Sequence, residues 1–325
     1  MQAPKPKTVY QEVRNAPSKV APTRSPNCIN MIRETKGNNR KRRGYETLYT
    51  LDGAINGFHV LRINNEEKTL VHAGSRIYLH GTQPSLLYSQ ANNHISTSRQ
   101  IGKKLFILDG SSLLVYDGQT VKKASDGAYV PTITIAKTYQ GGGTRYEPVN
   151  LLTPWRTERF MGDGANKTFQ LGAAGIDSDA VSIKALNSTG SFDTLIENTD
   201  FTVDRANGKF TLNTARATPV AGEDNLYVTG YADRIGKCDI CTIYGINGQR
   251  DRLFAAGNPD LPHYDWYCKS NAPTMWGDTW YAVIGQPDSS IVGYSHVNDY
   301  LVIQKNAAAN DMNAVLRRGV YDSEA

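Results

Sequence analysis

The 325-residue chain lacks long apolar segments and several common catalytic motifs. No run of 18 apolar residues occurs, which argues against a transmembrane helix. The N-terminus contains proline and lysine but no apolar h-region, so we expect no secretory signal. There is no G-x-S-x-G elbow, and the glycines at 141–143 are followed by neither Lys-Ser/Thr nor a helix start. These absences count against a lipase-like hydrolase and against a phosphate-binding loop.

Cysteine is scarce, with four residues in the chain. Cys238 and Cys241 have the spacing of a zinc or redox pair, but a structural zinc site needs a second pair of ligands. Only the isolated Cys28 and Cys268 remain for that role. Positions i and i+3 of a strand also point to opposite faces. We therefore expect reduced, buried thiols and no metal site.

Other candidate ligands and acid–base groups are equally dispersed. The six histidines stand singly and none has H-E-x-x-H spacing, so we expect His59, His72 and His80 to be packed or exposed strand residues. Asp177 and Asp179 lack the downstream acidic ligand of an EF-hand loop. No carboxylate pair of a glycosidase can be nominated. The sequence thus predicts no catalytic residue, no cofactor and no enzyme.

The chain does contain many short apolar runs separated by turn-forming residues, most clearly from Arg252 to Lys305. Runs of four to six β-branched and aromatic residues there stop at Gly, Pro, Asn or Asp, as at Gly257-Asn258-Pro259. Such runs are strands of an antiparallel sheet, and no helical period competes with them. The same pattern occurs at 70–80 and 105–116. The sequence therefore predicts an all-β protein.

Hairpins that recur at intervals of roughly 40–50 residues are typical of β-propeller blades. An ordinary β-sandwich or meander stays open as the alternative, because the repeat is degenerate and carries no WD-type signature. Residues 312–325 read as the middle of another hairpin. We therefore expect too few hairpins to close a propeller of about 4–8 blades within this chain.

The segment 257–305 resembles a specific family, the β-propeller proteins of tailed-bacteriophage tails: tail nozzle, tail hub and head-to-tail stabilisation proteins. The residues that carry the resemblance are Gly257, Asn258, Pro259, Tyr264, Trp266, Pro273, Trp276, Gly293, Asp299, Tyr300 and Leu301. Residues 27–45 are similar to the family's opening, and 55–59 with 70–74 to its first blade. The turn after Pro273 departs from the family pattern.

Residues 156–232 read as a small β unit inserted into the propeller. Lys167–Leu171, Val181–Leu186 and Asn225–Thr229 alternate, which indicates one buried and one wet face. Phe201–Val203 is expected to pair with Lys209–Leu212 through a turn containing Asn207-Gly208, the pair that favours a type I′ turn. The segment resembles the immunoglobulin-like decoration modules of phage structural proteins.

The N-terminal arm, residues 1–44, holds most of the basic character. It has 11 Lys/Arg against Glu12 and Glu34, whereas the rest of the chain is mildly acidic. Its five prolines favour extended chain. The cluster Arg40, Lys41, Arg42 and Arg43 has three open interpretations: sequence-independent contact with DNA phosphates, docking on an acidic neighbouring subunit, or a solvated flexible tail.

These observations predict four parts: the arm 1–44, a first propeller part 45–155, the immunoglobulin-like insert 156–232 and a second propeller part 233–325. The resemblance implies a virion protein made in the bacterial cytoplasm, a homo-oligomeric and sixfold ring through which DNA is ejected, with tail and portal-adaptor proteins as neighbours. A carbohydrate-binding or carbohydrate-active propeller that engages the cell wall is the alternative. Its sugar platform would be the aromatic residues Tyr264, Trp266, Tyr267, Trp276, Trp280 and Tyr281, which we expect instead to pack between strands.

Overall fold

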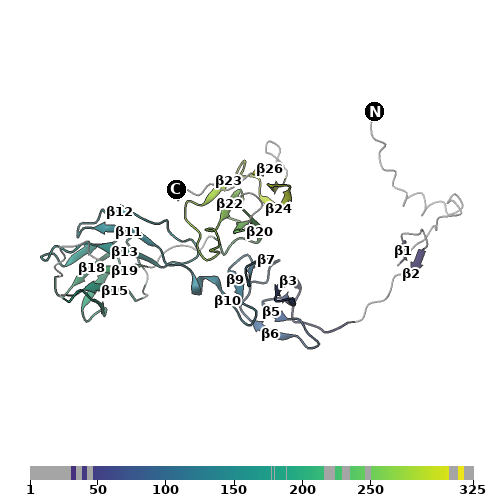
Figure 1. Ribbon diagram of the computed structural model, residues 1–325, viewed down its shortest axis with the longest axis horizontal. Coiled ribbons are helices and arrows are strands. Elements are labelled where there is room, and N and C mark those ends of the chain that lie inside the picture. Colours follow the sequence, from purple (N-terminus) through teal and green to yellow (C-terminus); the bar gives the residue numbers. More distant parts are fainter. Residues whose placement is uncertain are drawn as a thin grey trace. The chain divides into compact units, whose positions relative to one another are not determined.

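The structure is a computed structural model that describes residues 31–33, 39–41, 47–176, 178, 180–187, 189–215, 224–228, 235–245, 250–306 and 314–317 (Figure 1). The chain forms two compact units, Met1–Thr50 and Leu51–Ala325. The described residues include 26 strands, and their helical element is the 3-10 turn η2 (Ala124–Gly127). The expected all-β class is thereby confirmed. Among these residues no helix has the length and apolarity required to cross a membrane.

In the first unit, β1 (Met31–Arg33) and β2 (Asn39–Lys41) form an antiparallel pair in which Ile32 is opposite Arg40. Most of the predicted arm, including Arg42 and Arg43, lies outside the described residues.

Four small antiparallel sheets, here called sheets I to IV, build most of the second unit (Figure 1). Sheet I comprises β3 (Ile55–Ile63), β4 (Glu66–Ala73), β5 (Arg76–Leu79) and β6 (Ser85–Tyr88). Sheet II comprises β7 (Thr97–Ile101), β8 (Lys104–Leu108), β9 (Leu113–Tyr116) and β10 (Val121–Lys123). Sheet III comprises β20 (Ile240–Tyr244), β21 (Arg252–Ala256), β22 (Tyr264–Tyr267) and β23 (Tyr281–Val283). Sheet IV comprises β24 (Ile291–Val297), β25 (Tyr300–Lys305) and β26 (Ala314–Arg317).

Within each sheet the strands pair in chain order, so each sheet is a meander of short hairpins. The strands expected between residues 252 and 305, and the hairpins at 70–80 and 105–116, are all present. Their positions follow from the sequence because apolar runs of this length alternate with residues that form turns.

Three apolar cores connect the four sheets in chain order. Sheets I and II share one core, which includes Leu70 and Ile107. Sheets II and III share a second, with Phe106 and Trp266, and sheets III and IV a third, with Phe254 and Ile303. Because sheets II and III are covered on both faces, β9 and β21 are buried along their whole length. Such strands appear in the sequence as continuous apolar runs without alternation.

The first strands of these sheets are also neighbours in space. Strand β3 lies against β7, and β20 lies against both β7 and β24. The sheets therefore meet along their first strands.

Between β10 and β20 the chain forms a pair of sheets with a core of its own. One has six strands in the order β12 (Thr144–Arg145), β11 (Thr132–Lys137), β13 (Arg156–Phe160), β19 (Asp224–Val228), β15 (Ile183–Leu186) and β16 (Phe192–Leu195). The other has three, β14 (Thr168–Gln170), β18 (Lys209–Leu212) and β17 (Phe201–Asp204). Phe160, Phe169 and Phe210 pack together at the centre. Strands β11 and β12 precede residue 156, where the insert was expected to begin.

The expected hairpin in this unit is confirmed, but its turn differs. Phe201 is opposite Leu212, and Asp204 opposite Lys209, which leaves a four-residue loop. Only Gly208 of the Asn207-Gly208 pair has a positive φ, of 62°, so the predicted type I′ turn was wrong. Asn207 instead donates its backbone N–H to the carboxylate of Asp204 (3.1 Å). A Cβ on Gly208 would lie 1.9 Å from the carbonyl oxygen of Ala173, which explains why glycine is required there.

Candidate functional site

The basic cluster is only partly described. The backbones of Arg40 and Lys41 belong to β2, and Arg42 and Arg43 lie outside the described residues. All three interpretations of this cluster stay predictions.

The three described cysteines lie in the core that sheets II and III share. Cys238, Cys241 and Cys268 are free thiols and buried, as expected. Cys238 precedes β20, so the argument that strand positions i and i+3 face apart does not apply to it, and it packs into the same core as Cys241. Burial raises the pKa of the Cys268 thiol to about 12, so this sulfur stays protonated. In the described part of the chain, no three Asp, Glu, His or Cys side chains gather into a metal site.

Two histidines that stand apart in the sequence meet between sheets I and II. His59 on β3 and His72 on β4 are both buried, and both contact Ser96, which precedes β7. The Ser96 Oγ lies 2.9 Å from His59 Nε2 and 2.7 Å from His72 Nδ1. His59 Nδ1 lies 2.9 Å from Ser98 Oγ on β7. The expectation that His59 and His72 are packed strand residues is therefore confirmed, and their meeting at Ser96 adds a contact that the sequence did not predict.

The local geometry of the hairpin brings the two rings together. His59 pairs with Leu70, and two residues further on His72 pairs with Gly57, so both imidazoles lie on the face of sheet I that packs on sheet II. A side chain on Gly57 would approach Ser96 Oγ to 2.8 Å. The hairpin register and the side-chain parity of the two strands could have revealed this pair, because strand residues alternate between faces.

Burial determines the charge of this histidine pair. Burial, and to a smaller extent the neighbouring His72, lower the pKa of His59 to about 4. The pKa of His72 is also lowered by burial, although Asp109 acts in the opposite direction. Both imidazoles are thus neutral near pH 7, and serine hydroxyls contact both ring nitrogens of His59 and the Nδ1 of His72. Because Ser96 itself is buried, this cluster of hydrogen bonds links the two sheets, and Ser96 is not a solvent-accessible nucleophile.

We expect acid to lower the stability that this buried histidine cluster provides. A histidine in the unfolded chain takes up a proton near pH 6.5, whereas the His59 imidazole in the folded chain stays neutral down to about pH 4. The unfolded state therefore binds more protons between these values, so stability is complete above pH 6.5 and falls as the pH decreases toward 4. The expected loss between pH 6.5 and 5 is about 2 kcal/mol. Urea unfolding at several pH values measures it; a His59→Gln variant with an equally steep decline would contradict this assignment.

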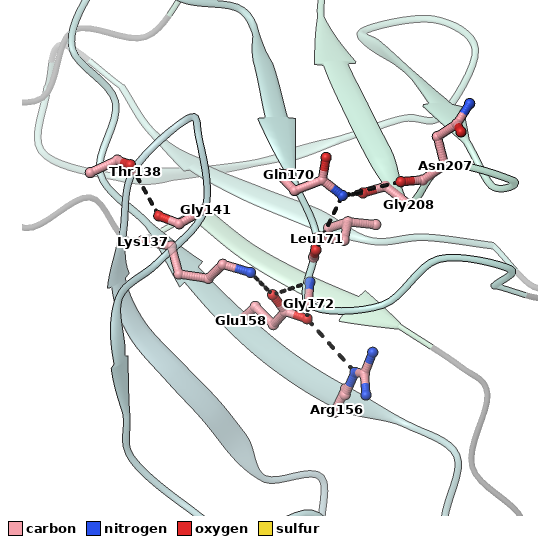
Figure 2. A network of polar contacts seen from close by, with 10 residues as sticks. All are labelled: Lys137, Thr138, Gly141, Arg156, Glu158, Gln170, Leu171, Gly172, Asn207 and Gly208. Atoms are coloured by element: carbon pink, nitrogen blue, oxygen red, sulfur yellow. Dashed lines mark hydrogen bonds and ion pairs between the residues drawn. The ribbon is translucent and has the colours of Figure 1, made fainter.

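A second buried polar network lies in the pair of sheets between β10 and β20, where charged side chains from two strands of the six-stranded sheet meet (Figure 2). Lys137 on β11 and Glu158 on β13 are both buried and form an ion pair between Nζ and Oε2. Arg156 Nε lies 3.7 Å from Glu158 Oε1. The backbone N–H of Gly172 donates to both carboxylate oxygens, at 3.0 and 2.9 Å. Glu158 thus accepts hydrogen bonds from Lys137 and Gly172 and forms a longer ion pair with Arg156.

The backbone around Lys137 is adapted to this network. Ala136 has a positive φ of 54°, and the pairing of β11 with β13 shifts register on both sides of Thr134. The irregular strand turns the Lys137 side chain into the sheet, where its ammonium also lies 4.9 Å from the centre of the Phe160 ring. Sequence reasoning missed this group because its three charged residues come from two strands whose pairing is parallel and non-local.

The aromatic residues considered as a sugar platform divide into two sets. Trp266, Trp276 and Trp280 are buried. Tyr264 stacks on Tyr281 across β22 and β23, with ring centres 4.8 Å apart. For the three tryptophans the expectation of packing is confirmed.

The residues that carry the family resemblance occupy structural positions in sheets III and IV. Gly257 has φ +83°, and a Cβ there would lie 1.8 Å from a carboxylate oxygen of Asp239. Trp276 is fully buried and donates its indole N–H to the Pro273 carbonyl (2.8 Å). Gly293 lies at a register shift of β24, and Leu301 is in the apolar core. None of these four has a solvent-exposed reactive group, so these four positions serve packing and turns, whereas Asp299 and Tyr300 of the same motif are exposed.

No family model, curated protein or solved structure matched the chain in the comparisons.

Proposed function

We propose that this chain is a structural virion protein of a tailed bacteriophage, a β-propeller subunit of a tail nozzle, tail hub or head-to-tail ring. The observation that carries the proposal is the placement of the motif shared with that family. Its residues build turns and cores of sheets III and IV, as with Trp276 and Leu301. A motif of this kind preserves an architecture, which agrees with a structural role.

The relation among sheets I to IV supports the propeller. In propellers, four-stranded meanders follow one another around an axis, and each packs on the next. Here three sheets are four-stranded meanders, each is joined to the next by an apolar core, and the first strands lie beside one another. An aligned two-sheet sandwich would give a single core between two faces. The insert then decorates the propeller between its second and third sheets.

The proposed mechanism is architectural. Sheets with buried faces form a rigid wall, identical subunits form a ring, sixfold as the resemblance implies, and DNA passes through its channel during ejection. The basic cluster that begins with Arg40 and Lys41 docks on an acidic neighbouring subunit or on tail and portal-adaptor proteins, with sequence-independent DNA contact as the further role. Closed rings of this kind use heterologous contacts, so each subunit presents two different surfaces.

Immunogold labelling tests the location. We expect antibody against the chain to label the tail or head-to-tail region of phage particles that encode it. Deleting residues 1–26 is expected to leave the sheets folded but to reduce incorporation into particles, because the arm makes subunit contacts. Quantitative mass spectrometry of purified particles measures the incorporation. Particles without the chain would refute the function, and unchanged incorporation of the deletion variant would refute the role of the arm.

A further inference from the structure

The two end sheets differ from the inner ones in what covers them. Sheets II and III are buried on both faces, because each lies between two apolar cores. Sheet I contributes to one of these cores with one face, and sheet IV likewise. Each end sheet therefore has a second face that none of the three cores covers.

The second face of sheet IV carries exposed apolar residues and no charged residue from β24 or β25; Ser295 and Gln304, which also lie on it, hydrogen-bond to each other (3.2 Å). Val297 and Tyr300 are directly opposite on β24 and β25 and are 54% and 38% exposed, and Val292 is 52% exposed. The single charged side chain in the two strands, Lys305, is buried and donates to the Ile284 carbonyl (2.5 Å). An antiparallel sheet face in contact with water normally alternates with polar residues throughout, so the exposed Val292, Val297 and Tyr300 indicate a contact surface.

The second face of sheet I is also apolar at its middle. A cross-strand row runs over all four strands, with Phe58 opposite Val71, Val71 opposite Tyr78 and Tyr78 opposite Leu86. Val71 and Tyr78 are buried, but Phe58 and Leu86 at the two ends of the row are 68% and 52% exposed. Charged residues border the row, among them Arg62, which pairs with Glu67.

These two faces lie at the opposite ends of one series of sheet-on-sheet contacts. We call the face of a sheet that packs on the next sheet along the chain its onward face, and the face that packs on the preceding sheet its backward face. In every internal contact, an onward face packs on a backward face. Sheet IV exposes an onward face, formed around Val297, and sheet I exposes a backward face, formed around Phe58. Both stay exposed in the described chain, so one copy does not join them to each other.

We propose that the onward face of sheet IV binds the backward face of sheet I in a second copy of this chain. The contact continues the internal series of sheet-on-sheet packing from one subunit to the next. It is heterologous, so it propagates head to tail and closes into a ring when the rotation permits. This inference rests on the proposed homo-oligomer and names the surfaces that form it.

Two single-face variants test the contact by complementation. Phe58→Glu places a charge on the sheet I face and leaves sheet IV intact, whereas Val297→Glu does the reverse. Light scattering coupled to gel filtration should give an oligomer for the natural chain and a monomer for each variant alone. Their equimolar mixture retains one good contact, so we expect a twofold mass and nothing larger. Phe192→Glu, at an exposed apolar residue of the insert, is the matched control and should assemble like the natural chain.

The contact would be overturned if the natural chain were monomeric at all concentrations, or if both variants assembled normally. A mixture that stays monomeric would also overturn it, provided that both variants retain the circular dichroism of the natural chain. Assembly of Phe58→Glu but not of Val297→Glu would indicate that two sheet IV faces meet, which also overturns it. If the natural chain is monomeric in solution but antibody labels phage tails, the inference fails and the proposed function stands.

Discussion

Replacing Glu158 by Gln is expected to destabilise the insert by about 3–5 kcal/mol, because it leaves the buried Lys137 ammonium without its counter-ion. The amide oxygen of Gln can still accept from the Gly172 N–H, so the variant removes charge and little else. Hydrogen exchange read out on peptides from the insert measures the loss directly, since it reports local stability in a chain whose parts need not unfold together.

Two further variants make this prediction specific. Glu197→Gln alters the partly exposed pair with Arg205 (2.8 Å), whose side chains are 25% and 17% exposed for Arg205 and Glu197, and because solvent screens it more than the buried pair we expect a smaller loss, of about 1 kcal/mol. The double variant Lys137→Met, Glu158→Gln removes both charges of the buried pair, so we expect it to regain much of the stability lost by Glu158→Gln alone. Equal losses for Glu158→Gln and Glu197→Gln would mean that the network does not depend on charge pairing.

Replacing Trp276 by Ala should cost about 3–5 kcal/mol, because it empties a large volume in the core that sheets II and III share. The loss should extend to sheet II: peptides around Phe106 should exchange faster although they lie far from residue 276 in the sequence. Exchange mass spectrometry on both segments tests this coupling between sheets.

The contribution of the Trp276 side-chain volume can be separated experimentally from that of its indole N–H hydrogen bond. Trp276→Phe keeps most of the volume but leaves the Pro273 carbonyl without its donor, for which we expect a smaller loss of about 1–3 kcal/mol. Tyr146→Ala removes an exposed aromatic side chain and should change the stability by less than about 0.5 kcal/mol. If Trp276→Ala left exchange in sheet II unchanged, the two sheets would not share a cooperative core.

Much of the fold could be predicted from the sequence because its determinants are local. Apolar runs bounded by turn residues located the strands between 252 and 305, and the pairing of 201–204 with 209–212 followed from a short loop. Inner strands such as β21 were recognisable since they are continuously apolar. That these sheets form a propeller, closed or open, stays a prediction.

The polar groups could not be predicted because they depend on non-local pairing. His59 and Ser96 meet only when sheet I packs on sheet II, and Lys137 reaches Glu158 only through a parallel pairing with shifted register. Neither strand pattern contains that information: period and propensity describe one element at a time. The position of Gly257 was recognised as part of a motif, but its reason, the close approach of Asp239, needed coordinates.

The shared core of sheets II and III has a consequence for synthesis on the ribosome. Phe106 is translated about 170 residues before Trp276, its companion in that core, and the whole insert is made between them. At translation rates of about 5–20 residues per second, the face of sheet II that packs on sheet III stays uncovered for on the order of 10–30 s until sheet III has been synthesised. Nascent chains of this length expose an apolar strand surface, so chaperone demand during translation should be greatest while the insert is emerging.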